Sequence, residues 1–110
     1  MRNEEIIEVD VDDFLFQGEV YGLIKVPLNH INFDRRNKKR SDFSVEEVVK
    51  IVIRELEGNF LTPTGHKNGI DFFVHILLYE DRPYKLVFEV SEKVLCITVI
   101  TLFRQKVTKE

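Results

Sequence analysis

Residues 43–58 of this chain, FSVEEVVKIVIRELEG, give its clearest structural signal. Ser44 and Glu47 have the spacing of a capping box, while Phe43 and Val48 stand at the two positions of a hydrophobic staple. Apolar residues then recur at helical spacing, and Gly58 supplies a C-terminal stop. The segment therefore predicts a helix. Because its apolar side is rich in β-branched residues, which favour helices only weakly, tertiary burial must hold it in place.

Three long strand signals follow this helix. They cover residues 70–79, 84–90 and 94–103, and the short polar breaks between them predict hairpins. A further strand is expected over 59–64, joined to the next by a loop at 65–69. The C-terminal half is therefore predicted to be an antiparallel β-meander.

The N-terminal part gives weaker signals. Residues 7–12 alternate apolar and acidic side chains, a pattern that fits a half-buried strand or a short helix. Residues 20–26 predict a strand, ended by Pro27 because proline donates no backbone hydrogen bond. The predicted class is α+β, with an N-terminal strand and one or more helical segments packed on the C-terminal meander.

Composition fits a globular protein with one domain, residues 1–110. The chain is 44% hydrophobic and 32% charged, too apolar for a disordered protein. Its single cysteine, Cys96, excludes an intrachain disulfide and a cysteine-based zinc cluster. The acidic start does not resemble a signal peptide, and we expect a cytoplasmic protein without membrane segments, metal or cofactor.

The tightest registers that the polar breaks allow pair Tyr79 with Tyr84 and Val90 with Val94. They sort the strand residues onto two faces. One face, which includes Phe72, is almost entirely apolar and is the expected seat of the helix. The other face, expected to meet a ligand, carries polar groups among apolar ones: His75, Tyr79, Tyr84 and Arg104.

A cluster of cations stands out against the net charge of -3. Five of the six residues from 35 to 40 are basic: Arg35, Arg36, Lys38, Lys39 and Arg40. Their mutual repulsion would be relieved by an RNA backbone, although a solvated loop explains them equally well. His30 lies just upstream. His75 has two open interpretations, a catalytic group or a core histidine with satisfied hydrogen bonds.

Three motifs together carry a resemblance to a known superfamily. They are His30-x4-Arg35 with Arg40 just before the helix, the YKLVF run at 84–88, and the VITLFR run at 99–104. Over residues 28–105 this order resembles the RelE-type and RegB-type bacterial and phage endoribonucleases, a superfamily that includes barnase-like and EndoU-like folds.

The resemblance implies a toxin-type or phage-type enzyme that cleaves RNA without metal through attack by the 2'-hydroxyl. It implies His30 and His75 as proton-transfer groups and Arg104 as the phosphate clamp, with Arg35, Arg36, Lys38, Lys39, Arg40, Tyr79 and Tyr84 binding RNA. The partners it implies are RNA, including ribosome-bound mRNA, and a cognate antitoxin. The alternative is a noncatalytic binding domain, such as an immunity, antitoxin-like or phage regulatory protein, whose acidic N-terminal segment contacts a basic partner.

Overall fold

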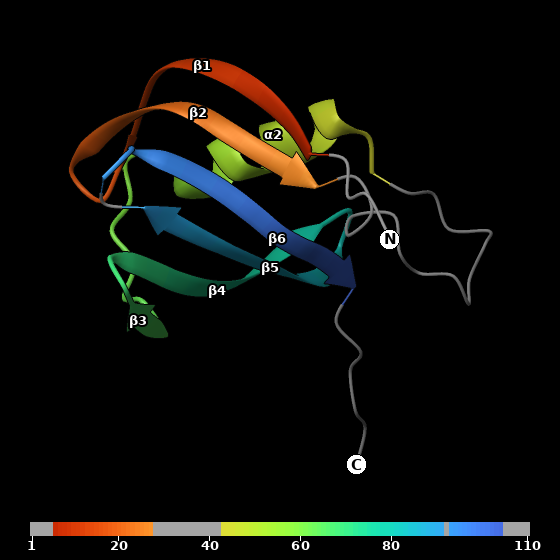
Figure 1. Ribbon diagram of the computed structural model, residues 1–110. Helices are drawn as coiled ribbons and strands as arrows, with labels where there is room; N and C mark the ends of the chain where they lie inside the picture. The colour runs from red at the N-terminus through yellow and green to blue at the C-terminus, as the bar shows by residue number, and fades with distance from the viewer. Residues whose placement is uncertain (1–5, 28–42, 92, 105–110) are drawn as a thin grey trace, which may run out of the picture.

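The computed structural model describes residues 6–27, 43–91 and 93–104. In chain order its elements are β1 (Ile6–Phe16), β2 (Glu19–Pro27), α2 (Val45–Leu56), β3 (Gly65–Lys67), β4 (Ile70–Tyr79), β5 (Arg82–Ser91) and β6 (Cys96–Arg104) (Figure 1). His30 and the basic residues Arg35, Arg36, Lys38, Lys39 and Arg40 lie outside the described residues.

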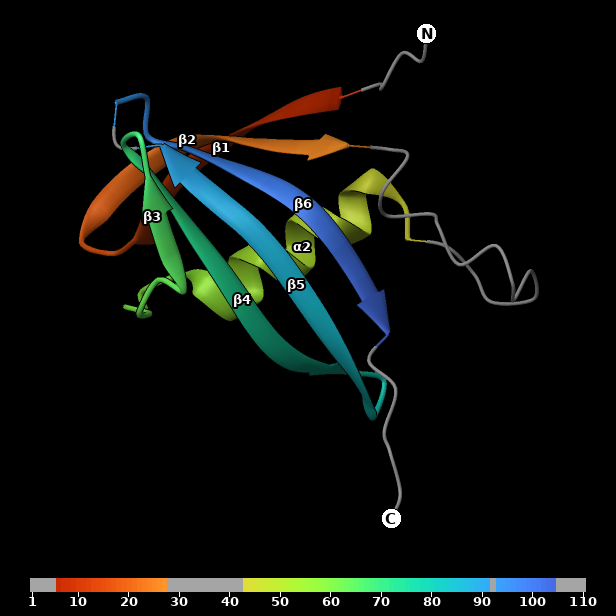
Figure 2. The ribbon, with the colours of Figure 1, turned by 60° about the horizontal axis from the view of Figure 1, so that its bottom comes forward.

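The described strands form one six-stranded sheet in the order β1-β2-β6-β5-β4-β3. All neighbouring pairs are antiparallel except β2 and β6, which run in the same direction. The helix α2 crosses one face of this sheet (Figures 1 and 2). The predicted α+β class and the C-terminal meander β4-β5-β6 are confirmed. Residues 7–12, left open between strand and helix, belong to strand β1.

Local sequence explains the hairpins. Gln17 and Gly18, Asn68 and Gly69, and Glu80 and Asp81 occupy the turns between paired strands, and all six have positive φ angles. Two successive residues with positive φ form the turn whose twist matches that of the flanking strands. Glycine, asparagine and aspartate adopt this conformation more readily than Gln17 and Glu80, which adopt it at some conformational cost.

The helix begins as predicted. The Ser44 side chain accepts a hydrogen bond from the Glu47 backbone N–H at 3.1 Å, and the Ser44 N–H donates to the Glu47 carboxylate at 2.9 Å. Val48, Val52 and Leu56 are fully buried on the sheet. Among the described residues, no helix has the length and apolar character needed to cross a membrane.

Aromatic side chains fill the space between α2 and the sheet. The rings of Phe73 and Phe88 stack with their centroids 4.9 Å apart, and the edge of Phe16 meets both. The three residues come from β1, β4 and β5, so the core joins the N-terminal hairpin to the meander. Burial of such large side chains supplies the main driving force for this packing.

The prediction of a strand over 59–64 is wrong. The backbone groups there bind the tip of the first hairpin instead of a neighbouring strand: the Gln17 N–H donates to the Asn59 carbonyl, and the Gln17 amide bonds both backbone groups of Leu61. The extra strand forms directly after this stretch as β3, inside the segment expected to be a loop. Contacts with a residue remote in sequence, Gln17, thus determine the structure of this segment.

Both predicted registers are also wrong. Tyr79 pairs with Arg82, and Val90 pairs with Ile97. The register of β5 against β6 shifts between Val87 and Phe88. Odd-numbered residues of β6 therefore face the helix before the shift along β6, and even-numbered residues face it after the shift.

The face assignment is therefore corrected as well. The helix packs on the face that carries Phe73, Leu86 and Phe88, which is also the face of His75. The face predicted to seat the helix leaves Val74, Ile76 and Leu78 exposed instead.

Candidate functional site

Three aromatic rings meet where β4 turns into β5. Phe43, just before the helix cap, lies 5.3 Å from both Tyr79 and Tyr84 between ring centroids, and the two tyrosine rings are 5.9 Å apart. All three side chains are half-buried. Clustered aromatic side chains that are not fully enclosed are the kind of group on which nucleic acid bases stack.

Arg104 lies beside this aromatic cluster, which we define as Phe43, Tyr79 and Tyr84. It is paired with Tyr84 across the β5–β6 ladder and is exposed. Opposite residues of paired strands point to the same face of a sheet, so the guanidinium and the Tyr84 ring share one surface. Arginine can hold a phosphate through two parallel hydrogen bonds.

Chain direction connects the basic segment with this end of the sheet. β2 runs parallel to β6, so the chain leaves Pro27 in the direction of Arg104 (Figure 2). It is described again at Phe43, inside the aromatic cluster. Residues 28–42, which contain His30 and the five basic residues, lie outside the described residues.

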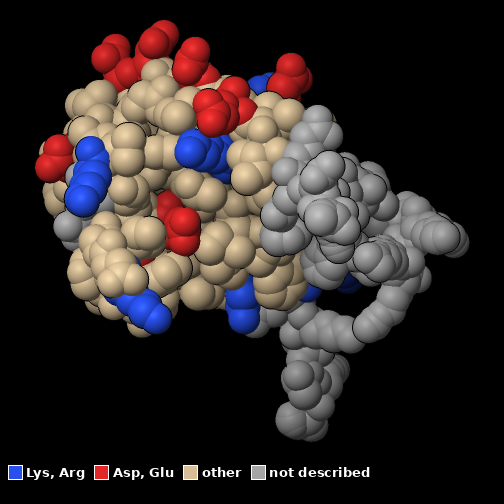
Figure 3. Space-filling model, viewed as in Figure 1, with Lys and Arg blue, Asp and Glu red and all other residues tan. Residues whose placement is uncertain are grey.

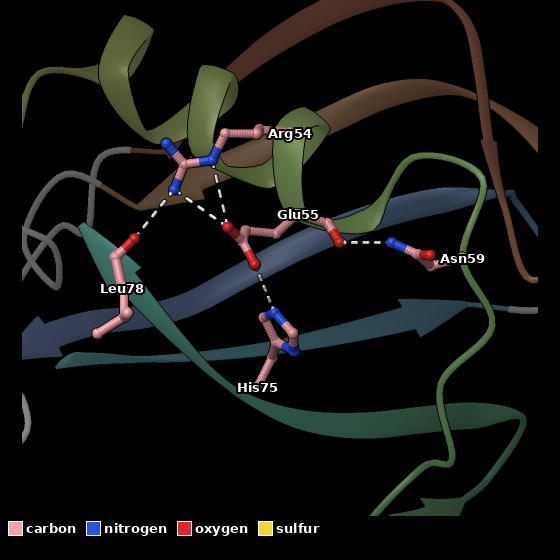
Figure 4. A network of polar contacts seen from close by, with 5 residues as sticks. All are labelled: Arg54, Glu55, Asn59, His75 and Leu78. Atoms are coloured by element: carbon pink, nitrogen blue, oxygen red, sulfur yellow. Dashed lines mark hydrogen bonds and ion pairs between the residues drawn. The ribbon is translucent and has the colours of Figure 1, made fainter. Parts of the chain in front are cut away.

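His75 has a defined partner. Its Nε2 lies 2.9 Å from Oε1 of Glu55 on α2, and both side chains are about one-fifth exposed, 21% and 22%. The second Glu55 oxygen accepts hydrogen bonds from Arg54 at 3.1 and 3.2 Å, while Arg54 also donates to the Leu78 carbonyl at 3.3 Å (Figure 4). The imidazole is therefore oriented by a carboxylate that is itself held in place.

The predicted site residues are only partly brought together. His75, Tyr79, Tyr84 and Arg104 share one face, as the sequence predicted, but the helix covers part of it. His75 on β4 is opposite Leu86, which lies two residues along β5 from Tyr84. Tyr84 is opposite Arg104 on β6, so two strand spacings separate His75 from Arg104. Standard strand spacing then puts the Cα atoms of His75 and Arg104 about 12 Å apart.

Tyr79 of the cluster keeps its proton at neutral pH. Partial burial raises the pKa of Tyr79, and the carboxylates of Glu47 and Glu80 raise it further. The phenol can thus donate a hydrogen bond or stack on a base, but it is a poor general base. Within the described residues, no group of three or more His, Cys, Asp and Glu side chains is arranged to hold a metal ion.

The edge strand β1 has a different surface. The carboxylates of Glu8, Asp10, Asp12 and Asp13 are exposed along it, and acidic side chains gather over this edge in Figure 3. Lys25 on β2 approaches Glu8 at 4.0 Å. A concentrated negative edge is suited to attract a basic partner.

Sequence reasoning missed two residues of the site. Glu55 stands among several charged residues of the helix, and its contact with His75 depends on how the helix crosses the sheet. Phe43 was recognised as a staple residue, yet its ring contacts two tyrosines that lie more than 30 positions later. Neither contact has a signature in local sequence.

Comparisons with protein-family models, with curated proteins and with solved structures find no match to this chain. The mixed sheet with α2 on one face is compatible with a RelE-type fold but is not specific to it.

Proposed function

We propose that this protein is a metal-independent endoribonuclease of toxin or phage type that binds RNA at the end of the sheet where the aromatic cluster meets Arg104. One observation carries the proposal: Tyr84 is paired with Arg104 and contacts Phe43, to which the basic segment is joined. Arg40 precedes Phe43 by three residues, a span of at most about 11 Å of chain. Stacking groups, a phosphate-binding group and a cluster of cations are thus available to one single-stranded RNA.

The chemistry proposed for this site uses the RNA's own 2'-hydroxyl as nucleophile. His30 accepts the hydroxyl proton while the oxygen attacks the adjacent phosphorus, and Arg104 stabilises the additional negative charge. The bond from phosphorus to the 5'-oxygen then breaks, and a general acid protonates the leaving oxygen. The products are a 2',3'-cyclic phosphate and a free 5'-hydroxyl.

His75 is the second proton-transfer group in this proposal. Glu55 orients its imidazole in the way a carboxylate orients a catalytic histidine. Because about 12 Å separates the His75 and Arg104 backbones, both side chains must extend over Tyr84 to reach the same scissile phosphate.

A cleavage assay on single-stranded RNA tests the proposal. Arg104→Ala should slow cleavage by at least about 100-fold, the scale of losing an electrostatic clamp, without loss of folding by circular dichroism. Lys93→Ala is the matched control, because it removes an exposed cation in the turn at the opposite end of β6. Equal losses in both variants, or cleavage of RNA with 2'-deoxyribose at the scissile position, would contradict the mechanism.

A binding assay tests the basic segment separately. Replacing Arg35, Arg36, Lys38, Lys39 and Arg40 with Gln should weaken RNA binding and flatten its dependence on salt, because fewer counterions are released. An unchanged salt slope would mean that these cations do not contact the RNA backbone.

A noncatalytic binding domain is the second candidate function, favoured by the acidic edge of β1. Its partner would be a basic protein that meets Asp10, Asp12 and Asp13. Replacing these three residues with Asn should abolish binding to a model basic protein such as a histone while leaving RNA cleavage intact. Retained binding would exclude β1 as the contact surface.

A further inference from the structure

The strand β4 has a partner on one side only for much of its length. Because Tyr79 and Arg82 close a two-residue turn, the odd-numbered residues of β4 direct their backbone groups toward β5. The even-numbered residues direct theirs toward the opposite edge of the strand. Two hydrogen bonds agree with this pattern, since the carbonyls of Phe72 and Leu78 are both bonded from that edge.

These two bonds mark the limits of the open edge. At one limit β3 pairs with residues 70–72, and Thr64 donates to the Phe72 carbonyl. At the other limit the Arg54 guanidinium donates to the Leu78 carbonyl at 3.3 Å. Between them, the backbone groups of Val74 and Ile76 have no partner on this side among the described residues. Unpaired groups on a sheet edge are a template for another strand.

The side chains on this edge are apolar and uncharged. Val74, Ile76 and Leu78 are 42%, 50% and 66% exposed on the face away from the helix, and residues 72–79 contain no acidic or basic side chain apart from His75. The other sheet edge, β1, carries four exposed carboxylates, which would face like charges if two such edges met. The β4 edge is free of that repulsion.

We propose that the β4 edge pairs antiparallel with β4 of a second copy of this chain, and that Arg54 competes with this pairing by capping the Leu78 carbonyl. The neutral apolar strand is its own complement, because an antiparallel pair about a two-fold axis sets apolar residues opposite apolar residues on the outer face. Capping opposes pairing, because the guanidinium lies at the carbonyl to which the second strand would donate.

The structure limits the register of such a pair. Val74 opposite Ile76 of the copy would set Leu78 of the copy opposite Phe72, a place that Gly65 of β3 already occupies. Ile76 opposite Leu78 avoids this conflict, because the copy then turns away before reaching Phe72. In that register Ile76 of each copy is opposite Leu78 of the other. Each of these two residue pairs forms two backbone hydrogen bonds, which gives four in all.

The Arg54 cap is held by the network of Figure 4. Glu55 accepts from both Nε and an Nη atom of Arg54, and His75 contacts the other Glu55 oxygen. These contacts fix the guanidinium near Leu78. Glu55 and His75 therefore act on the edge as positioning residues, in addition to any role in proton transfer.

Sedimentation velocity over a wide concentration range tests the proposal on the full chain. Arg54→Ala should lower the dissociation constant of the dimer at least about tenfold, because it frees the Leu78 carbonyl of each copy to accept a hydrogen bond from the pairing strand. Arg82→Ala is the matched control, because it removes an exposed arginine beside the same turn. Adding Ile76→Lys to Arg54→Ala should return the protein to the monomer, because each copy would then carry a charged side chain within the paired stretch.

Amide hydrogen exchange distinguishes this pairing from other contacts. As the Arg54→Ala protein is concentrated, exchange at Ile76 and Leu78 should slow while Val74 is unaffected. Equal association of Arg54→Ala and wild type, or a dimer that Ile76→Lys leaves intact, overturns the proposal. So does association without protection of Ile76 and Leu78, since the copies then meet through another surface. A protein that stays monomeric in every variant also overturns it, because the freed β4 edge then does not pair with a second copy.

Discussion

The two faces of β4 are similar in sequence and opposite in environment. Phe73 and Leu77 are 1% and 4% exposed beneath the helix, whereas their neighbours Val74 and Leu78 are 42% and 66% exposed on the outer face. Both sets are apolar, so hydrophobicity does not separate them. The difference teaches that a strand rich in apolar residues has two candidate core faces, and that the position of α2 chooses between them.

The largest effect should come from placing a charge on the inner face. Val52→Asp buries an unpaired carboxylate where the side chain is fully enclosed, which costs about 3 kcal/mol or more and should leave the domain unfolded at neutral pH. Circular dichroism and thermal denaturation measure it. Lys50→Asp, on the exposed side of the same helix, should fold normally. A stable Val52→Asp protein would mean that the helix does not pack as described.

Two adjacent phenylalanines compare the faces directly. Phe73→Ala removes a ring stacked on Phe88 and should lower the free energy of unfolding by about 3–5 kcal/mol. Phe72→Ala removes a half-buried ring of the same size from the outer face and should cost clearly less. Urea denaturation of both variants gives the difference. If the two losses are equal, an unseen contact covers the outer face.

Weakening the start of the helix should lower the stability of the domain by a smaller amount. Ser44→Ala removes the acceptor for the Glu47 N–H and should lower the stability of the domain by about 1 kcal/mol. Amide exchange in β5 should rise by the same factor as exchange in α2 if helix and sheet unfold together. Faster exchange in α2 alone would show that the sheet persists without its helix.

The smallest effect is expected on the outer face. Ile76→Thr keeps a β-branched shape on an exposed strand position and should change the free energy of unfolding by less than about 0.5 kcal/mol. Chemical denaturation at low protein concentration measures it without interference from association. A loss of several times that size would show that Ile76 is covered in solution.

Local sequence was sufficient where local physics decides. The capping box at Ser44 and Glu47, the helical spacing that follows it and the alternation in residues 70–79 each stabilise their element through neighbours in the chain. The shared face of His75, Tyr84 and Arg104 was likewise predictable from the two-residue period of strands. This shared face was predicted correctly although both registers were wrong. The β4–β5 register was wrong by an even number of residues, and the odd error between β5 and β6 was offset by the irregularity in β6.

The sequence by itself determined the α+β class, the helix and the meander. The tertiary structure decided which face of the meander the helix covers, why residues 59–61 bind the first hairpin and how Glu55 reaches His75. The physical reason lies in the range of the interactions. Capping, turn preference and alternation act over a few residues, whereas the covered face depends on how α2 and the Phe16 ring fill the space against Phe73 and Phe88. No pattern within β4 encodes that choice, because both of its faces are apolar.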